Sequence, residues 1–232
     1  MNSPTRIALS VLVGAGLLAA REPAAAQAAK PTVAIMYFNN NVFSKDARDY
    51  DGLMKGVPDF LVSEMSSNPN IRVIERDQVQ KLIDEQKLTS GGQVDRETAV
   101  KVGKLLGAQH MIFGGFTADP KGNFRIDARA VNVETGAIEY TDRVQDHADN
   151  VLALIGQLAG RLNSGLRLGT PTRTGDAGTR LPMRIAVLYG KALDMADKGD
   201  KAKAVELFGA VLREFPDYTP ARTGLNKVKP GG

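Results

Sequence analysis

The order of two apolar patterns between residues 29 and 168 limits the possible folds more than any other feature of the chain. Five short runs rich in β-branched and aromatic residues are typical of strands: TVAIMYF (32–38), IRVIE (71–75), HMIFGGFT (110–117), FRIDARAVNV (124–133) and AIEYTDRV (137–144). Segments with apolar residues at helical spacing lie between and after them. The resulting order is strand, helix, strand, two helices, three strands, helix. It predicts an α/β fold in which a mixed sheet is flanked by helices.

The helices of this region are predicted from their spacing and from their ends. They cover Leu53 to Met65, Asp77 to Gln86, the stretch from Asp95 to Leu106, and Ala148 to Leu166. Asp95 is a plausible N-cap, and Gly107 is a plausible C-terminal stop. The apolar stripe Phe60, Leu61 and Met65 is predicted to belong to the core and not to a cofactor site.

A break in composition predicts the domain organisation. Residues 169–182, GTPTRTGDAGTRLP, hold Gly, Thr, Pro and Arg and no large apolar residue before Leu181, as linkers do. We therefore predict a signal peptide at 1–28, an α/β domain at 29–168, a linker at 169–182 and a helical hairpin at 183–228.

The N-terminal segment has the layout of a secretory signal. Arg6 precedes an apolar run from Ile7 to Ala20, and small residues follow. The run is shorter than the roughly 20 residues that a bilayer-spanning helix needs, so cleavage after Ala26 or Ala28 is favoured over a retained anchor. A bacterial lipoprotein would carry its lipidated cysteine where this chain has Arg21, and the chain has no cysteine. We expect a periplasmic protein without a membrane-spanning segment in the mature chain.

Composition argues against several other classes of function. The absence of cysteine excludes disulfides, thiolate zinc sites and thiol catalysis. The formal net charge of +4 comes from basic residues scattered among acidic ones, and there is no tryptophan. A binding surface for nucleic acid is therefore not expected.

Searches for reactive motifs find none. No nucleophile elbow, phosphate-binding loop, zinc-protease motif or calcium loop is present. His110 and His147 could hold a metal, but satisfied or exposed histidines are the favoured interpretation. Gly114-Gly115 is explained by packing of a helix on a strand at least as well as by a ligand. We predict no catalytic residue, no cofactor and no metal, and therefore no enzyme.

Three stretches carry a family resemblance. RVIERDQVQKLIDEQKLTSGG (72–92), AVKVGKLLGAQHMIFGGFT (99–117) and DARAVNVETGAIE (127–139) resemble the periplasmic domain of the CsgG curli secretion channel family, whose fold type is shared by the TolB N-terminal domain and by LpoB. The residues that fall in the family's pattern are Glu75, Arg76, Glu85, Gln86, Gly103, Gly107, Thr135 and Gly136. Glu75 with Arg76 is open to two interpretations, a ligand clamp or an ion pair that holds a strand to a helix, and the ion pair is favoured.

The chain departs from the channel pattern in two respects. The anchoring cysteine is absent, and two membrane hairpins would need on the order of 40 more residues. Only a short turn joins Phe116 to Phe124, and QDHADN separates Val144 from Val151. The alternating residues Arg125, Asp127 and Arg129 are predicted to face water.

The C-terminal segment resembles a tetratricopeptide repeat between Leu188 and Ala221. The residues at the spacing of the repeat are Ala192, Gly199, Ala204, Phe208 and Pro216, with Val211 where a smaller residue is usual. Small residues let two helices approach, Phe208 fills the space between them, and Pro216 ends the second helix. One such unit buries too little surface to stand alone. It must dock on the first domain, on a second copy, or on another protein.

The sequence thus predicts a non-enzymatic periplasmic scaffold or accessory protein of the CsgG family. It would act through protein–protein binding in assembly or export at the cell envelope, with envelope or outer-membrane proteins as partners and with homo-oligomers as an option. The alternative is a subunit of an outer-membrane secretion channel whose membrane strands come from partner chains. Curli-like export, outer-membrane assembly and activation of peptidoglycan synthesis all remain open as contexts.

Overall fold

The computed structural model describes residues 29–86, 94–169 and 181–229. Its elements are β1 (Thr32–Asn40), η1 (Ala47–Tyr50), α1 (Leu53–Met65), β2 (Arg72–Val73), α2 (Arg76–Gln86), α3 (Arg96–Leu106), β3 (His110–Ala118), β4 (Asn123–Asn132), β5 (Ile138–His147), η2 (Ala148–Asn150), α4 (Val151–Gly165), α5 (Met183–Asp197), α6 (Lys201–Glu214) and α7 (Thr219–Val228). The predicted signal peptide and most of the predicted linker lie outside the described residues.

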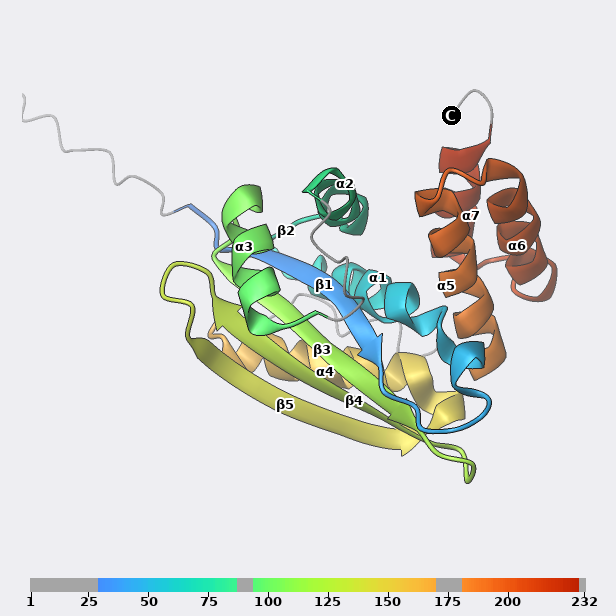
Figure 1. Cartoon of the computed structure of the whole chain (residues 1–232), viewed down its shortest axis with the longest axis horizontal. Coiled ribbons are helices and arrows are strands. Elements are labelled where there is room, and N and C mark those ends of the chain that lie inside the picture. Colours follow the sequence, from blue (N-terminus) through green and yellow to red (C-terminus); the bar gives the residue numbers. More distant parts are fainter. Residues whose placement is uncertain (1–28, 87–93, 170–180, 230–232) are drawn as a thin grey trace, which may run out of the picture.

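The strands form one mixed sheet in the order β2-β1-β3-β4-β5 (Figure 1). β1 runs parallel to both β2 and β3, whereas β3, β4 and β5 are antiparallel neighbours. β2 has two residues instead of the predicted five, because α2 starts only three residues after it. The mixed sheet with flanking helices confirms the predicted fold class.

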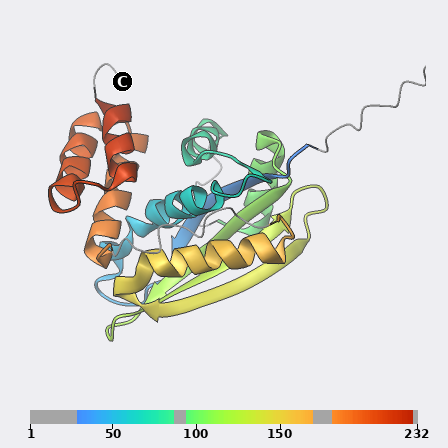
Figure 2. The same cartoon turned by 180° about the vertical axis from the view of Figure 1, so that it is seen from behind.

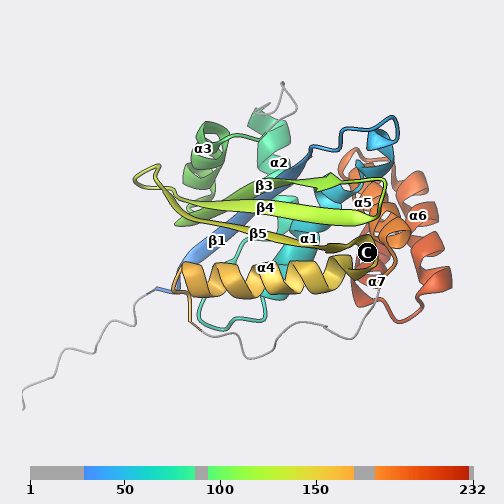
Figure 3. The same cartoon turned by 90° about the horizontal axis from the view of Figure 1, so that it is seen from below.

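Helices cover both faces of the sheet and create two cores (Figures 2 and 3). Side chains such as Ile35, Ile112 and Phe116 pack under α1 and α4 on one face. On the other face, residues such as Met36 and Met111 pack under α2 and α3. The N-cap and stop of α3 are confirmed: the Asp95 carboxylate accepts a hydrogen bond from the Thr98 N–H, and Gly107 has a φ of 64°.

Three helices follow the linker, one more than predicted. α6 ends at Glu214, shortly before Pro216, as expected. α7 then starts with a proline in its first turn. Ala221 and Val228 are its only buried residues. α5 packs on α1, and α6 and α7 follow it at the same end of the molecule (Figure 1). Among the described residues, no helix has the length and apolar character that crossing a membrane requires.

α3 covers one face of β4 only near the C-terminal end of the strand, where Val131 and Val133 are buried. Arg125, Asp127 and Arg129 lie on this face, opposite to the buried Phe124, Ile126 and Ala128. Asp127 accepts hydrogen bonds from Arg125 and from Arg143 of β5, both at 2.8 Å. The side chains of Arg125 and Asp127 are 38% and 36% exposed. The prediction that these positions face water is therefore confirmed.

Side chains cap backbone groups of the edge strand β5. The N–H of Arg143 donates to the Asp142 carboxylate at 2.7 Å, and the C=O of Arg143 accepts from Arg161 of α4 at 3.3 Å. The N–H of His147 donates to the Asp146 carboxylate at 2.7 Å. Burial would raise the pKa of Asp142, but the Arg143 N–H, the Tyr140 hydroxyl and Arg161 together lower it. These edge groups already have partners within the chain, so they do not offer a free template to another strand.

Candidate functional site

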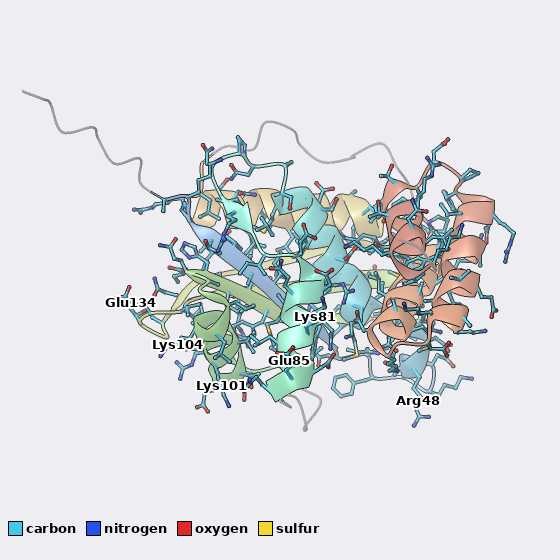
Figure 4. The ribbon with its side chains drawn as sticks, turned by 90° about the horizontal axis from the view of Figure 1, so that it is seen from above. Arg48, Lys81, Glu85, Lys101, Lys104 and Glu134 are labelled. Carbon is cyan, nitrogen blue, oxygen red and sulfur yellow. The ribbon has the colours of Figure 1, made fainter. Side chains whose placement is uncertain are left out.

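The residues that carry the CsgG resemblance are spread over the α/β part and do not meet. Gly103 of α3 packs against Val133, which a Cβ would approach to 2.6 Å. Thr135 and Gly136 form the β4–β5 turn, where Gly136 has a φ of 70°. Glu75 is exposed, and Glu85 and Gln86 are exposed at the end of α2 (Figure 4 labels Glu85). Only Arg76 enters a polar cluster.

Arg76 joins the α/β part to the C-terminal helices. Its Nη1 and Nη2 donate to the two carboxylate oxygens of Asp197 in α5, at 2.8 and 3.0 Å. Its Nε donates to Asp59 of α1 at 3.3 Å. Lys55 also donates to Asp197, at 3.0 Å. The interpretation favoured from the sequence is an ion pair that holds a strand to a helix. In the structure Arg76 belongs to α2, and its partners belong to α1 and to α5, which follows the linker.

Tyr189 makes the second polar link between α5 and α1. Its hydroxyl donates to Asp59 at 2.6 Å, and its ring stacks on Phe60 with centroids 5.4 Å apart. Burial raises the pKa of Asp59, and the charge of Arg76 and the hydroxyl of Tyr189 offset this only in part. Burial, with the charge of Asp59, raises the pKa of Tyr189 well above 10. The tyrosine therefore stays neutral and serves as a hydrogen-bond donor.

The raised pKa of Asp59 predicts how the stability of the chain depends on pH. Because it lies above its ordinary value of 3.8, the native chain takes up a proton at Asp59 at a pH where the unfolded chain does not. The contribution of this group to stability therefore falls as pH rises. We expect wild type to gain stability relative to Asp59→Asn as pH is lowered from 7 towards 4, measured by urea unfolding at each pH. A difference that stays constant or shrinks would contradict this.

Two glycines let α5 lie directly against the start of α1. A Cβ on Gly190 would stand 1.8 Å from the carbonyl oxygen of Gly52, and a Cβ on Gly52 would stand 2.2 Å from the carbonyl oxygen of Val187. Both obstacles are backbone atoms, which no change of rotamer can move. The docking of the C-terminal helices therefore depends on small residues in both segments.

Gly190→Ala should lower the free energy of unfolding by about 1 to 3 kcal/mol or more, because the added methyl forces α5 away from α1. The matched control is Gly209→Ala in α6, where a Cβ meets only the end of Arg213 at 3.9 Å. That variant should gain about 0.5 to 1 kcal/mol from the better helix former. Urea unfolding of both variants measures the two effects, and equal shifts would refute the close approach.

The residues of the tetratricopeptide pattern lie within the C-terminal helices. Ala192, Ala204 and Phe208 have no exposed surface. Gly199 occupies the turn between α5 and α6 with a φ of 77°. Pro216 lies in the turn after α6 and lines a pocket. The structure thus brings three of these residues into the packing between helices and one to a surface site.

This pocket is where the α/β part and the C-terminal helices form a common surface. It has a volume of about 280 Å³. Its walls come from α1, from α4, and from the end of α6 with the start of α7. The lining residues are Asp59, Phe60, Ser63, Glu64, Leu152, Ile155, Glu214, Phe215, Pro216, Asp217, Tyr218, Thr219 and Pro220. Apolar and aromatic side chains thus alternate with four carboxylates.

The other candidates from the sequence lead to no reactive centre. His110 forms an ion pair with Glu139, and His147 lies beside Asp149 at 3.3 Å. The described ranges hold no group of three or more histidine, aspartate or glutamate side chains placed to bind a metal. Gly114 is needed by neighbouring strands and not by a helix: its Cβ would stand 2.0 Å from the Asp127 carbonyl oxygen and 2.8 Å from the Phe38 ring.

Sequence reasoning missed Asp59, Tyr189 and Asp197, which form the cluster with Arg76, and it missed the pocket. One signal was available. Tyr189 and Gly190 lie next to each other in the apolar stripe of α5, where a hydroxyl needs a partner and a glycine suggests close contact. Neither feature says which helix lies opposite, so the partner in α1 could not be named.

The described chain is therefore a three-layer α/β protein with an additional helical layer docked on α1. Residues 17–121 match the family model described as curli production assembly/transport component CsgG. The predicted resemblance to CsgG is thus confirmed over this range, which ends in the β3–β4 turn. No curated protein matches the chain.

Solved structures with similarity to the chain include the following three. The LpoB C-terminal domain from Escherichia coli is 13% identical, with 51% of this chain and 83% of that one covered and a TM-score of 0.37. TolB from Acinetobacter baumannii is 10% identical, with 59% and 28% covered and a TM-score of 0.39. The lipoprotein GNA1162 from Neisseria meningitidis is 12% identical, with 56% and 98% covered and a TM-score of 0.37.

Proposed function

We propose that this protein is a non-enzymatic accessory protein of the cell envelope that acts by binding another envelope protein. The CsgG match over residues 17–121 supports the envelope context. The observation that carries the proposal is the pocket, because α1, α4 and the α6–α7 turn each supply part of its wall. A concave, partly apolar site with a few polar groups is what a binding protein offers to a ligand or to a peptide segment.

The C-terminal helices have two roles in this proposal. They complete the pocket, and the cluster of Arg76, Asp59 and Asp197 holds them in a fixed position on the α/β part. The predicted boundaries at 29–168 and 183–228 then describe two segments that cooperate in one binding site. A tetratricopeptide-like unit that docks on its own neighbour in this way presents the turn after α6 to a partner.

We place the protein in the periplasm, after removal of a signal peptide. Expression in a Gram-negative host should yield a chain released by osmotic shock that begins at Gln27 or Ala29, which N-terminal sequencing checks. Recovery of an uncleaved chain in the membrane fraction would contradict the proposed location but would leave the proposal about the pocket unaffected.

Site-specific photocrosslinking tests the binding site in the full chain. A benzoylphenylalanine at Thr219, on the rim of the pocket, should give one ultraviolet-dependent adduct with an envelope protein. The matched control position is Glu134 in the β4–β5 turn, at the end of the molecule remote from the C-terminal helices (Figure 4). It should give no adduct of the same mass.

A second variant connects the adduct to the pocket. Ser63 lines the pocket and is exposed on α1, so Ser63→Trp should fill the space without disturbing the core. We expect this change to abolish the Thr219 adduct while the melting temperature stays the same. An adduct that persists in Ser63→Trp, or that forms equally from Glu134, would overturn the proposal.

A further inference from the structure

The ionisable side chains that line the pocket include four carboxylates and no basic group. Asp59, Glu64, Glu214 and Asp217 contribute carboxylates, and no lysine or arginine is among the lining residues. The cations that pair with these acids lie outside the lining: Arg76 with Asp59, Arg184 with Glu214 and Arg222 with Asp217. Because the lining itself offers carboxylates and no basic side chain, the pocket favours a cationic occupant over an anionic one.

Aromatic rings line the pocket on the same two segments as the acids, α1 and the turn between α6 and α7. Phe60, Phe215 and Tyr218 line the pocket together with Leu152 and Ile155. Ring faces attract cations, and they attract guanidinium groups more often than ammonium groups. Apolar walls also accommodate the methylene stem of a long basic side chain.

The size of the pocket limits what it can hold. At about 280 Å³ it lies just below the range of roughly 300 to 1,000 Å³ that is usual for small-molecule sites. It is therefore large enough for one long side chain and its immediate neighbours. A side chain presented by a partner protein meets this limit.

We infer that the pocket is a receptor for an arginine side chain carried by an apolar segment of the partner protein. Arginine matches the site better than lysine, because its planar group can stack on the rings while its N–H fork donates to carboxylates. The inference rests on the proposed function and adds the chemistry of the partner. It assigns the carboxylates of the lining to recognition of the guanidinium, and the rings to its stacking.

The test uses the full mature chain labelled with ¹⁵N and four peptides. The peptides are Ac-Gly-Leu-Xaa-Leu-Gly-NH₂ with Xaa as arginine, citrulline, lysine or glutamate. Citrulline keeps the shape of arginine and removes its charge. The arginine peptide should shift the amide signals of Phe60, Leu152 and Phe215. The citrulline peptide should bind about 10-fold more weakly or worse, as expected when hydrogen bonds to charged groups lose their charge.

Neutral variants of the pocket give the matched comparison. Glu64→Gln with Asp217→Asn should weaken the arginine peptide about 10-fold or more. Glu97→Gln with Glu134→Gln removes the same charge from exposed positions outside the lining and should leave binding unchanged. A thermal melt of each variant establishes that it is folded.

Several results would overturn the inference. These are equal binding of arginine and citrulline, binding of the glutamate peptide, shifts located away from the pocket, or equal losses in both double variants. If the Thr219 adduct disappears in Ser63→Trp but is unchanged in Glu64→Gln with Asp217→Asn, the binding function stands and the arginine inference falls.

Discussion

Replacing Arg76 with alanine should lower the free energy of unfolding by about 3 to 5 kcal/mol, because it leaves two enclosed carboxylates without their common partner. The side chains of Asp59 and Asp197 are 23% and 10% exposed, so water can replace the guanidinium only poorly. Lys55 remains near Asp197 at 3.0 Å, which keeps the loss within this range. Urea unfolding followed by circular dichroism measures it.

The matched control is Arg96→Ala, which removes an exposed arginine of α3 and should change stability by no more than about 0.5 kcal/mol. Arg76→Met combined with Asp197→Leu should recover part of the loss, since it removes one of the two unpaired carboxylates while Asp59 keeps only the hydroxyl of Tyr189. If Arg76→Ala behaves like Arg96→Ala, the cluster does not hold the C-terminal helices in place.

Phe208→Ala is the second change with a large expected effect. Phe208 is fully buried, its ring centroid lies 5.9 Å from that of Tyr189, and a Cβ on Gly224 would stand 2.5 Å from the ring. Truncation to alanine leaves a cavity among α5, α6 and α7 and should cost about 3 to 5 kcal/mol. Because α5 also packs on α1, the loss should reach the α/β part, with the largest gain in amide hydrogen exchange in α6 and α7.

Phe43→Ala provides the control for the same chemical change. Phe43 is 97% exposed in the loop after β1, so its removal should shift stability by no more than about 0.5 kcal/mol. Equal midpoints for Phe208→Ala and Phe43→Ala would show that the three helices contribute nothing to the stability of the chain.

Local signals in the sequence were enough to predict most of the α/β part. Asp95 and Gly107 mark the ends of α3 through short-range hydrogen bonds and backbone geometry, which depend only on nearby residues. β-Branched runs likewise identify β1, β3 and β4. α7 was missed because it is short and has only two large apolar residues, Leu225 and Val228.

The candidate site depends on contacts between distant residues, and local patterns carry no information about these. Arg76 was noticed for its family pattern, but its partner Asp197 is 121 residues away, beyond the linker. Gly52 and Gly190 acquire their role only when α1 and α5 touch. Pro216 was expected to end a helix, and nothing near it in sequence shows that α1 and α4 close a pocket with it.

The capped edge of β5 has a consequence for how molecules of this protein can meet. Sheets of different molecules fuse when the unpaired amides of one edge find the carbonyls of another, which is also how fibrils begin. In this chain, Asp142, Asp146 and Arg161 already occupy such groups on the last strand. A strand of another molecule that added along this edge would have to displace these hydrogen bonds at Arg143 and His147, so the edge resists fusion at these positions.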